Sequence, residues 1–262
     1  MPAEGRFTTP SNSGIIPGVD QPVGPRLVGA RENGPGKNAM TEENQKITVR
    51  PSGPYLVRGA IPLVRKSQVM SPHGEPLEWK DEGVIDAGET YRLCRCGQSK
   101  SKPFCDGAHT MVEFDGTEAA DTGTAADRSK TLSSPDIIIQ DEHSICVHSG
   151  FCGTRLTNVW KMIGESQDPQ VKAQIIDMID NCPSGALAYS LEAEGEIIEP
   201  ELPKQVVAIP DGPLWITGGI PVERSDGKPL ETRNRVTLCR CGASAMKPLC
   251  DGTHKELGFT DS

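Results

Sequence analysis

Aromatic side chains are scarce in this chain of 262 residues: Phe, Trp and Tyr together make up 4%, and apolar residues 35%. Such a composition offers little material for one large hydrophobic core, although the length leaves room for two or three small domains. Small domains with weak cores can gain folding energy from a bound metal. The composition therefore favours several small units, stabilised in part by metal centres.

Other features are missing as well. The sequence has no apolar run of about 18 residues, the length of a membrane-spanning helix, and no secretory signal segment. It contains no Gly-x-Gly-x-x-Gly after an expected strand, no P-loop and no nucleophile elbow, so we do not expect an enzyme in its own right. The net charge of −9 argues against nucleic acid or an anionic membrane as partner.

Cysteine is the informative residue type. The chain has nine cysteines, an odd number, and all nine stand in short motifs typical of metal ligands. This arrangement argues against a disulfide scaffold and for thiols that are kept reduced. We therefore expect a cytoplasmic location.

One pattern, C-x-C-x8-C-x3-H, occurs twice. Both copies also keep the same Ser, Lys, Pro and Asp-Gly between the candidate ligands. Four thiol and imidazole groups within a short run that is rich in Gly and Pro indicate a compact metal centre. The candidate ligands are Cys94, Cys96, Cys105 and His109 in the first copy, and Cys239, Cys241, Cys250 and His254 in the second.

The spacing leaves two kinds of centre open. Structural zinc sites usually pair cysteines as C-x2-4-C, whereas the tighter C-x-C suits two thiolates on one iron of a cluster, with the third Cys and the His on the other. We expect Asp106 to be the N-cap of a short helix, which would place free N–H groups beside an anionic cluster. Spacing alone favours an iron–sulfur cluster and keeps zinc as the alternative.

With its intervening residues, the motif C-x-C-x2-S-x3-P-x-C-D-G-x-H resembles the CDGSH iron–sulfur domain family, the mitoNEET-like proteins. Only Ala108 and Thr253 differ from the family pattern, at the Ser in its name. The resemblance implies a [2Fe–2S] cluster with three Cys and one His in each copy, and it makes zinc a remote alternative. Because two such units pack as a homodimer in that family, two copies in one chain imply an intramolecular pseudo-dimer.

The repeat extends upstream of the ligands. Residues 51–62 recur as 210–221, each with a Pro-x-Gly-Pro turn and a Gly-x-Ile-Pro end. Apolar residues on both sides of the turn predict two short strands, followed by a hairpin, the ligand loop and a short helix. Additional residues in the first copy, 66–86, are expected to form a solvated surface hairpin.

A different motif lies between the two copies. Cys146, Cys152 and Cys182 fit the first, third and last positions of the bacterial ferredoxin pattern, with Pro183 after the last and Ser149 at the second. The segment 140–190 resembles single-cluster ferredoxins that hold a [3Fe–4S] centre and the related divergent one-cluster [4Fe–4S] domains. A strand at 137–139 and a helix at 171–180 are expected here.

The number of irons at this middle motif is open. Three cysteines can ligate three irons, so we favour a [3Fe–4S] cluster. The alternative is a [4Fe–4S] cluster with His148, Ser149 or solvent on the fourth iron.

Several residues near the motifs carry weaker signals. Lys102 and Lys247, and likewise Arg95 and Arg240, either balance the charge of a cluster or are simply solvated. His143 is expected to be exposed to solvent. The tryptophans are expected to anchor the core or an interface: Trp79, Trp160 and Trp215.

These observations predict an α+β protein with two small β-rich CDGSH units in an intramolecular pseudo-dimer and a small ferredoxin-like domain. We expect one-electron transfer by a monomer with internal pseudo-twofold symmetry. The alternatives are cluster storage, cluster transfer or redox sensing, and an electron-transfer subunit of an oxidoreductase. The expected partners are redox proteins or apo-acceptor proteins. The expected boundaries are an N-terminal arm at 1–45, unit 1 at 46–112, a linker at 113–135, the ferredoxin-like domain at 136–203 and unit 2 at 204–262.

Overall fold

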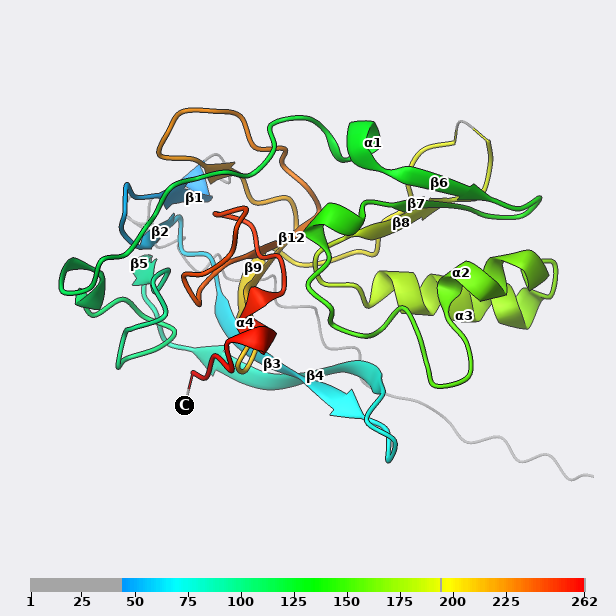
Figure 1. Cartoon of the computed structure of the whole chain (residues 1–262), viewed down its shortest axis with the longest axis horizontal. Helices are drawn as coiled ribbons and strands as arrows, with labels where there is room; N and C mark the ends of the chain where they lie inside the picture. Colours follow the sequence, from blue (N-terminus) through cyan, green and yellow to red (C-terminus); the bar gives the residue numbers. More distant parts are fainter. Residues whose placement is uncertain (1–43, 194, 262) are drawn as a thin grey trace, which may run out of the picture. The chain divides into compact units, whose positions relative to one another are not determined.

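The computed structural model describes residues 44–193 and 195–261 (Figure 1). Three small β-sheets and a few mostly short helices make up this part of the chain, which confirms the expected α+β class. The predicted N-terminal arm, 1–45, lies outside the described residues apart from its last two. Among the helices described, none has the length and apolar character needed to cross a bilayer.

The first sheet has the strand order β11-β1-β2-β5. Three of its strands come from the first copy of the repeat and run antiparallel: β1 (Lys46–Val49), β2 (Tyr55–Arg58) and β5 (Thr90–Leu93). The fourth strand, β11 (Val222–Glu223), comes from the second copy and pairs parallel with β1. The second copy therefore completes the sheet of the first.

The second sheet repeats this plan with the roles reversed. Its order is β12-β10-β9-β3-β4. The second copy contributes β9 (Gln205–Ala208), β10 (Leu214–Thr217) and β12 (Arg235–Leu238). The first copy contributes β3 (Leu63–Met70), which pairs parallel with β9, and its hairpin partner β4 (Pro76–Ile85).

Equivalent hydrogen bonds hold the two exchanged strands in place. The Ile47 N–H donates to the Pro221 carbonyl and the Val206 N–H donates to the Pro62 carbonyl, each over 2.9 Å. In both copies the chain therefore crosses to the other sheet at the Ile-Pro pair of the repeat. This reciprocal exchange confirms the predicted intramolecular pseudo-dimer.

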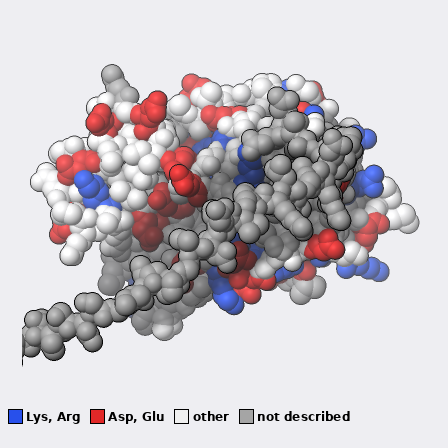
Figure 2. Space-filling model, turned by 180° about the vertical axis from the view of Figure 1, so that it is seen from behind, with Lys and Arg blue, Asp and Glu red and all other residues white. Residues whose placement is uncertain are grey.

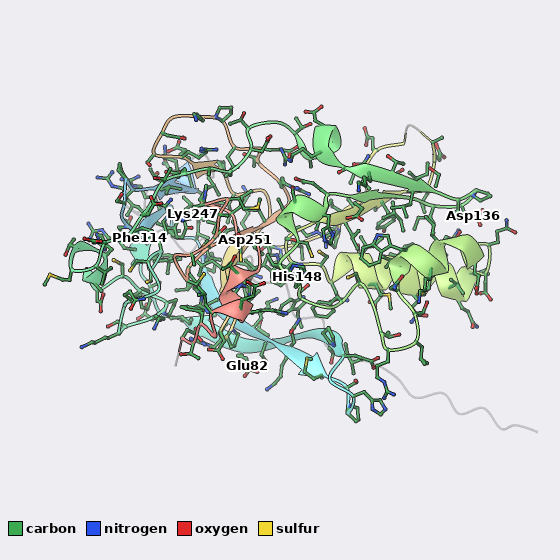
Figure 3. The ribbon with its side chains drawn as sticks, viewed as in Figure 1. Glu82, Phe114, Asp136, His148, Lys247 and Asp251 are labelled. Carbon is green, nitrogen blue, oxygen red and sulfur yellow. The ribbon has the colours of Figure 1, made fainter. Side chains whose placement is uncertain are left out.

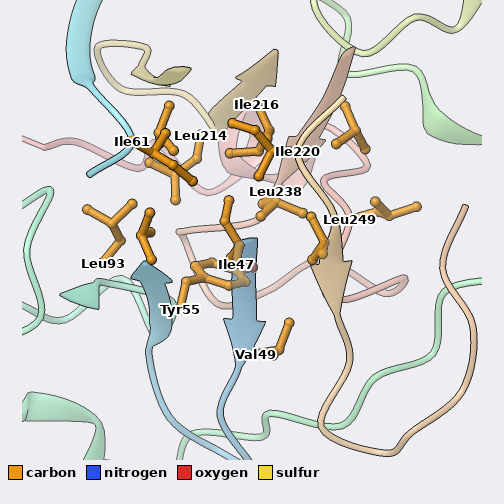
Figure 4. Close-up of a cluster of buried hydrophobic side chains, with 14 of the residues drawn as sticks. Ile47, Val49, Tyr55, Ile61, Leu93, Leu214, Ile216, Ile220, Leu238 and Leu249 are labelled. Carbon is orange, nitrogen blue, oxygen red and sulfur yellow. The ribbon is translucent and has the colours of Figure 1, made fainter. Parts of the chain in front are cut away.

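Both sheets contribute to one hydrophobic core (Figure 4). Alternate residues of β1 and β2 point into it, because side chains of a strand alternate between its two faces. The Tyr55 hydroxyl crosses to the other unit and donates to the backbone carbonyls of Cys239 (2.6 Å) and Pro248 (3.1 Å). Core residues from the two sheets include Ile47, Val49, Tyr55, Leu214, Ile216 and Leu238.

The two C-x-C loops approach each other backbone to backbone. Gly97 and Gly242, the residues directly after each C-x-C, have φ of 78° and 89°, a region that only glycine adopts without strain. A Cβ atom on Gly242 would lie 2.7 Å from the carbonyl oxygen of Cys96, and one on Gly97 would overlap the carbonyl oxygen of Cys241. Glycine is required at both positions by conformation and by space.

The middle domain has its own three-stranded antiparallel sheet and its own core. The predicted helix at 171–180 is present as α3, which begins where the Asp168 carboxylate accepts the Gln170 N–H and Pro169 occupies the first turn. The elements are β6 (Lys130–Ser133), β7 (Ile138–Asp141), β8 (Leu187–Ser190), α2 (Val159–Met162) and α3 (Pro169–Asp180).

The segment 113–135, expected to be a linker, is largely integrated into the fold. It contains α1 (Ala125–Arg128) and β6, which pairs with β7. The Ala119 and Ala120 N–H groups donate to the Lys247 carbonyl over 2.8 and 3.1 Å. Small polar residues suggested a linker, but pairing with distant segments decides the structure here.

The additional hairpin of the first copy also differs in part from expectation. β3 and β4 form the predicted hairpin, yet it is not wholly solvated, because it contacts the middle domain. The Gln68 amide donates to the Ser149 carbonyl (2.8 Å), and the Trp79 indole N–H donates to the Asn181 carbonyl (3.0 Å). The Trp79 ring also lies 5.1 Å from the rings of Phe151 and Trp215. Trp79 is therefore an interface anchor, as predicted.

Replacing Gly242 by Ala should destabilise the protein far more than replacing Gly74, although both have φ of 80° or more. Both variants carry the cost of a Cβ atom in the left-handed region, about 1–2 kcal/mol. Only at 242 does that atom also meet backbone, whereas nothing lies within 4 Å of it at 74. We expect the Gly242→Ala variant to lose about 2 kcal/mol more of its free energy of unfolding than Gly74→Ala, measured by chemical denaturation. Equal losses would contradict the close approach of the loops.

Candidate metal centres

The four candidate ligands of the first copy lie together as two pairs. The Sγ atoms of Cys94 and Cys96 are 3.9 Å apart, and Cys105 Sγ lies 3.4 Å from His109 Nδ1. Two backbone hydrogen bonds tie the segments that carry the pairs: Cys94 N–H to the Pro103 carbonyl (2.8 Å) and Cys105 N–H to the Arg92 carbonyl (3.0 Å). This ligand set is the first site.

The second copy reproduces this geometry and forms the second site. Cys239 Sγ and Cys241 Sγ are 3.7 Å apart, and Cys250 Sγ lies 3.4 Å from His254 Nδ1. The Cys239 and Cys250 N–H groups donate to the carbonyls of Pro248 (2.9 Å) and Thr237 (3.0 Å). All eight predicted residues are thus brought together in two equivalent sets.

The distances within each pair fit one tetrahedral metal. Two sulfurs bound at ~2.3 Å to such a metal lie about 3.8 Å apart, and a sulfur and an imidazole nitrogen about 3.6 Å apart. Among the described residues, no three His, Cys, Asp or Glu side chains surround a single point as ligands of one ion. Each pair could bind one metal, and the two pairs of a site could together hold a two-iron cluster.

An aspartate shapes the turn between Cys105 and His109. The Asp106 carboxylate accepts the N–H groups of Lys100 (2.8 Å) and Ala108 (3.0 Å), and these bonds lower its pKa. The N-cap of the short 3-10 helix η2 (Ala108–Thr110) is Gly107, so the prediction of Asp106 as N-cap is wrong by one residue. Asp251 makes equivalent hydrogen bonds in the second copy.

Hydrogen bonds favour the thiolate in each C-x-C pair. Cys94 and Cys239 each accept hydrogen bonds from the thiol of the second cysteine of the same C-x-C pair and from nearby backbone N–H groups. These hydrogen bonds lower the pKa of each to about 6. The same pairing raises the pKa of Cys96 and of Cys241. A thiolate is the form of cysteine that binds a metal.

The two sites differ in exposure. Cys250 and His254 are buried, whereas Cys105 and His109 are partly exposed. Burial, with Lys255 next in effect, lowers the pKa of His254 to about 4, and burial raises the pKa of Cys250 to about 12. Identical ligand types therefore stand in different surroundings.

The middle domain brings its three predicted cysteines to one cavity of about 250 Å³. Burial, followed by the neighbouring cysteines, raises the pKa of Cys152 to about 11. Three thiols in the positions of the ferredoxin pattern, on the wall of one cavity, could hold a cluster of several irons. The cavity is lined in part by Cys146, Cys152 and Cys182, and by His143, His148 and Ser149.

His148 connects this cavity to the second site. Its backbone is left-handed, with φ of 54°, and its Nδ1 lies 3.9 Å from Cys146 Sγ. Its ring packs against Gly252, where an added Cβ would lie 2.7 Å from the ring, so His148 lies next to the turn that holds Asp251 (Figure 3). The Lys255 ammonium donates to the His148 carbonyl.

His143 was expected to be only solvent-exposed. Although 69% of its side chain is exposed, it also lines the cavity of the middle domain. Its position three residues before Cys146 is the one sequence signal that could have found it.

Two arginines that were expected either to balance the charge of a cluster or to be solvated are instead buried parts of the fold. Arg95 and Arg240, between the cysteines of each C-x-C, are each only 1% exposed. Arg95 donates to the Gly116 carbonyl (2.8 Å) and Arg240 to the Gly212 carbonyl (2.6 Å). Arg240 also forms an ion pair with Asp261 over 2.8 Å. Both guanidinium groups anchor the ligand loops to backbone carbonyls and are not solvated.

Comparisons with known proteins agree with this geometry. A family model described as "Iron-binding zinc finger CDGSH type" matches residues 52–110 and 211–255, and one described as "Divergent 4Fe-4S mono-cluster" matches residues 132–192. CDGSH iron-sulfur domain-containing protein 3, mitochondrial, from Mus musculus and from Homo sapiens, is 70% identical over 23 residues. These residues are 9% of this chain and 17% and 18% of those proteins. No solved structure matches.

The chain is thus an iron–sulfur protein with two CDGSH segments and a divergent mono-cluster domain between them. This outcome confirms the resemblance drawn from the motifs. The chain spans less than a fifth of the length of the curated relatives it matches. The description of the middle family names a four-iron cluster, which agrees with the [4Fe–4S] alternative and gives no support to [3Fe–4S].

The ion pair of Asp261 with Arg240 should make stability depend on pH. Burial alone would raise the pKa of Asp261, but Arg240 and the Asp211 N–H outweigh burial and hold it below its ordinary value. A carboxyl with a depressed folded pKa stabilises above its unfolded pKa of about 3.9, and this contribution is lost as pH falls through the folded value. Asp261→Asn should therefore cost about 2 kcal/mol or more at neutral pH, because it leaves Arg240 unpaired.

The measurement is the difference in unfolding free energy between the parent and Asp261→Asn across the pH range. That difference should be largest at neutral pH and should shrink as pH falls below about 4. A constant difference would mean that the Asp261 charge does not contribute.

Proposed function

We propose that this chain is a one-electron carrier with a [2Fe–2S] cluster at each CDGSH site and a third cluster in the middle domain. In each CDGSH site the C-x-C cysteines would hold one iron, and the third Cys and the His the other. The proposed ligands are Cys94, Cys96, Cys105 and His109, Cys239, Cys241, Cys250 and His254, and, in the middle domain, Cys146, Cys152 and Cys182.

The chain's own residues would prepare each site for its cluster. Such a cluster supplies a reversible one-electron change when bound. The hydrogen bonds that lower the pKa of Cys94 and of Cys239 favour the metal-binding thiolate. Arg95 and Arg240 fix the two C-x-C loops from within, and burial of Cys250 and His254 excludes water from the second site.

For the middle domain we propose a [4Fe–4S] cluster, with [3Fe–4S] as the alternative. Three cysteines line the cavity, and a fourth iron needs a further donor or solvent. His148, His143 and Ser149 all line the same cavity and could supply that donor.

One observation favours electron transfer: the three ligand sets adjoin one another. The loop of the first site meets that of the second where Gly97 contacts Cys241, and the second meets the middle site where Gly252 contacts His148. Contacts of this kind would give an electron a short path through all three centres. A protein that only stores clusters has no need of such contiguity.

Cluster storage, cluster transfer or redox sensing is the second candidate, supported by the partial exposure of Cys105 and His109 at the first site. A role as electron-transfer subunit of an oxidoreductase is the third. We further propose that the protein is not itself an enzyme and acts as a monomer. All nine cysteines are unpaired, in keeping with a reducing compartment such as the cytoplasm.

Iron content tests the assignment of clusters. Protein purified without oxygen should hold about eight irons per chain with a [4Fe–4S] middle cluster and about seven with [3Fe–4S]. Cys146→Ser should remove the irons of the middle cluster and leave about four, measured by iron analysis and by EPR of the reduced protein. Zinc as the main metal, without the visible bands of iron–sulfur clusters, would contradict the proposal.

Replacing His109 by Cys tests electron transfer at the first site. A thiolate in place of a neutral imidazole adds negative charge, so the potential of the first site should fall by on the order of 100 mV. The variant should then be reduced more slowly than the parent by a given donor, measured by stopped-flow absorbance. If the parent is not reduced by the donor but transfers its clusters to an apo-ferredoxin, storage or transfer is the better assignment. His254→Cys is the matched variant at the buried site.

A further inference from the structure

The pseudo-symmetry of the two units fails at one surface. On β2 of the first unit, Tyr55 and Val57 face the core, and Leu56 and Arg58 lie on the other face, where Leu56 is buried and Arg58 is exposed. The equivalent residues of β10 are Trp215 and Thr217, both buried. The two units therefore differ at the end of this strand, where Arg58 is exposed in the first unit and Thr217 is covered in the second.

In the second unit this face is covered by the chain itself. Trp79 of the β3–β4 hairpin lies 5.1 Å from Trp215, ring to ring. A smaller cleft of about 360 Å³ next to His254 is lined by Ile209 to Pro213 of the turn and by Val147 and Ser149 of the middle domain. The loop that carries the middle cysteines thus docks beside the second CDGSH site.

In the first unit the equivalent residues line an open cleft of about 870 Å³ next to Cys105 and His109. Three exposed arginines surround it: Arg50, Arg58 and Arg92. Their counterparts in the second unit are Ile209, Thr217 and Thr237, none of which is charged. We define the arginine face as Arg50, Arg58 and Arg92 with the cleft between them.

The charge of this face is opposite in sign to the net charge of the chain, which is −9. Figure 2 shows several acidic patches, together with groups of Lys and Arg, on the described part of one side. Asp106 also lines the cleft, but its carboxylate is occupied by the N–H groups of Lys100 and Ala108. Arg92 lines the same cleft as Cys105 and His109, and its backbone carbonyl accepts the Cys105 N–H over 3.0 Å. The positive charge therefore lies at the cleft onto which two candidate ligands open.

We infer that the arginine face is the docking surface for a separate acidic redox protein, which exchanges one electron with the first site. This proposal rests on the proposed electron transfer, and it adds the kind of protein that donates the electron and the surface on which that protein binds. The partner would occupy the position that the middle domain occupies on the second unit. One electron leaves the reduced partner and enters the first site, whose partly exposed His109 lies at the cleft. Arginines around a part-apolar cleft suit an acidic protein surface, with Pro51 and Pro54 as its apolar contacts.

The test compares two triple variants of the full, cluster-loaded chain. Arg50→Glu/Arg58→Glu/Arg92→Glu reverses the arginine face. Lys130→Glu/Arg155→Glu/Lys161→Glu makes the same change in net charge at exposed positions outside the cleft. The visible spectrum shows whether each variant keeps its clusters, and Arg50→Glu/Arg58→Glu replaces the first triple if Arg92→Glu disturbs the adjacent ligand Cys105.

The probe is an acidic [2Fe–2S] ferredoxin. Binding of the oxidised ferredoxin, measured by calorimetry at low ionic strength (~10 mM, where the Debye length is about 30 Å), does not require electron transfer. We expect the reversed face to weaken binding and to slow reduction by the reduced ferredoxin at least tenfold, and the control triple to change either by less than about twofold. The advantage of the parent should shrink as salt is added.

Three results would overturn the proposal. The control triple could weaken binding as much as the reversed face, which would indicate net charge alone. A single-stranded oligonucleotide could bind as tightly as the ferredoxin, which would indicate a general polyanion surface. The reversed face could also leave ferredoxin binding unchanged. Failure of dithionite to reduce the parent would refute the proposed electron transfer but not the docking, since binding is measured separately.

Discussion

The close approach of the two C-x-C loops constrains the rest of the structure. Gly97 and Gly242 bring the backbone of each loop against the other, and no side chain fits between them. The exchanged strands β3 and β11 also join the two units, so neither sheet is complete without a strand from the other unit. Two small units with few aromatic residues thereby share one core, which neither could bury alone. The two ligand sets are consequently parts of one fold.

The sequence predicts what local spacing determines. The ligand sets, the turn before each second strand and the helix α3 all follow from residues that are neighbours in the chain. The strand exchange could not be predicted from residues 51–62 or 210–221 by themselves, because the same Ile-Pro end would serve a strand returning to its own sheet. The resemblance to a dimeric family predicted that the two units pack together, but not that they exchange strands. The strand β6 was likewise expected to be part of a linker, because its pairing with β7 could not be predicted from its own residues.

Charged residues were the least predictable part of the sites. Arg95 and Arg240 would ordinarily be placed at the surface, since arginine is seldom fully buried unless it is paired. Here each guanidinium satisfies backbone carbonyls of the turn that precedes the second strand of its unit. The direction in which these carbonyls point cannot be predicted from the sequence, because it depends on the conformation of the turn. The sequence also did not indicate that the three exposed arginines of the first unit lie close together. Only the fold places them around one cleft.

The difference between the two CDGSH sites follows from a few substitutions within the repeat. Where the first unit has Arg50 and Leu56, the second has Ile209 and Trp215, and this apolar pair allows the hairpin and the middle domain to cover its face. Covering removes water from around His254, whereas His109 stays partly exposed. An added electron increases the negative charge of either site, and burial penalises that charge more at the second than at the first. The same ligand set would therefore accept an electron more readily at the open site, which is also the site that a separate protein could reach.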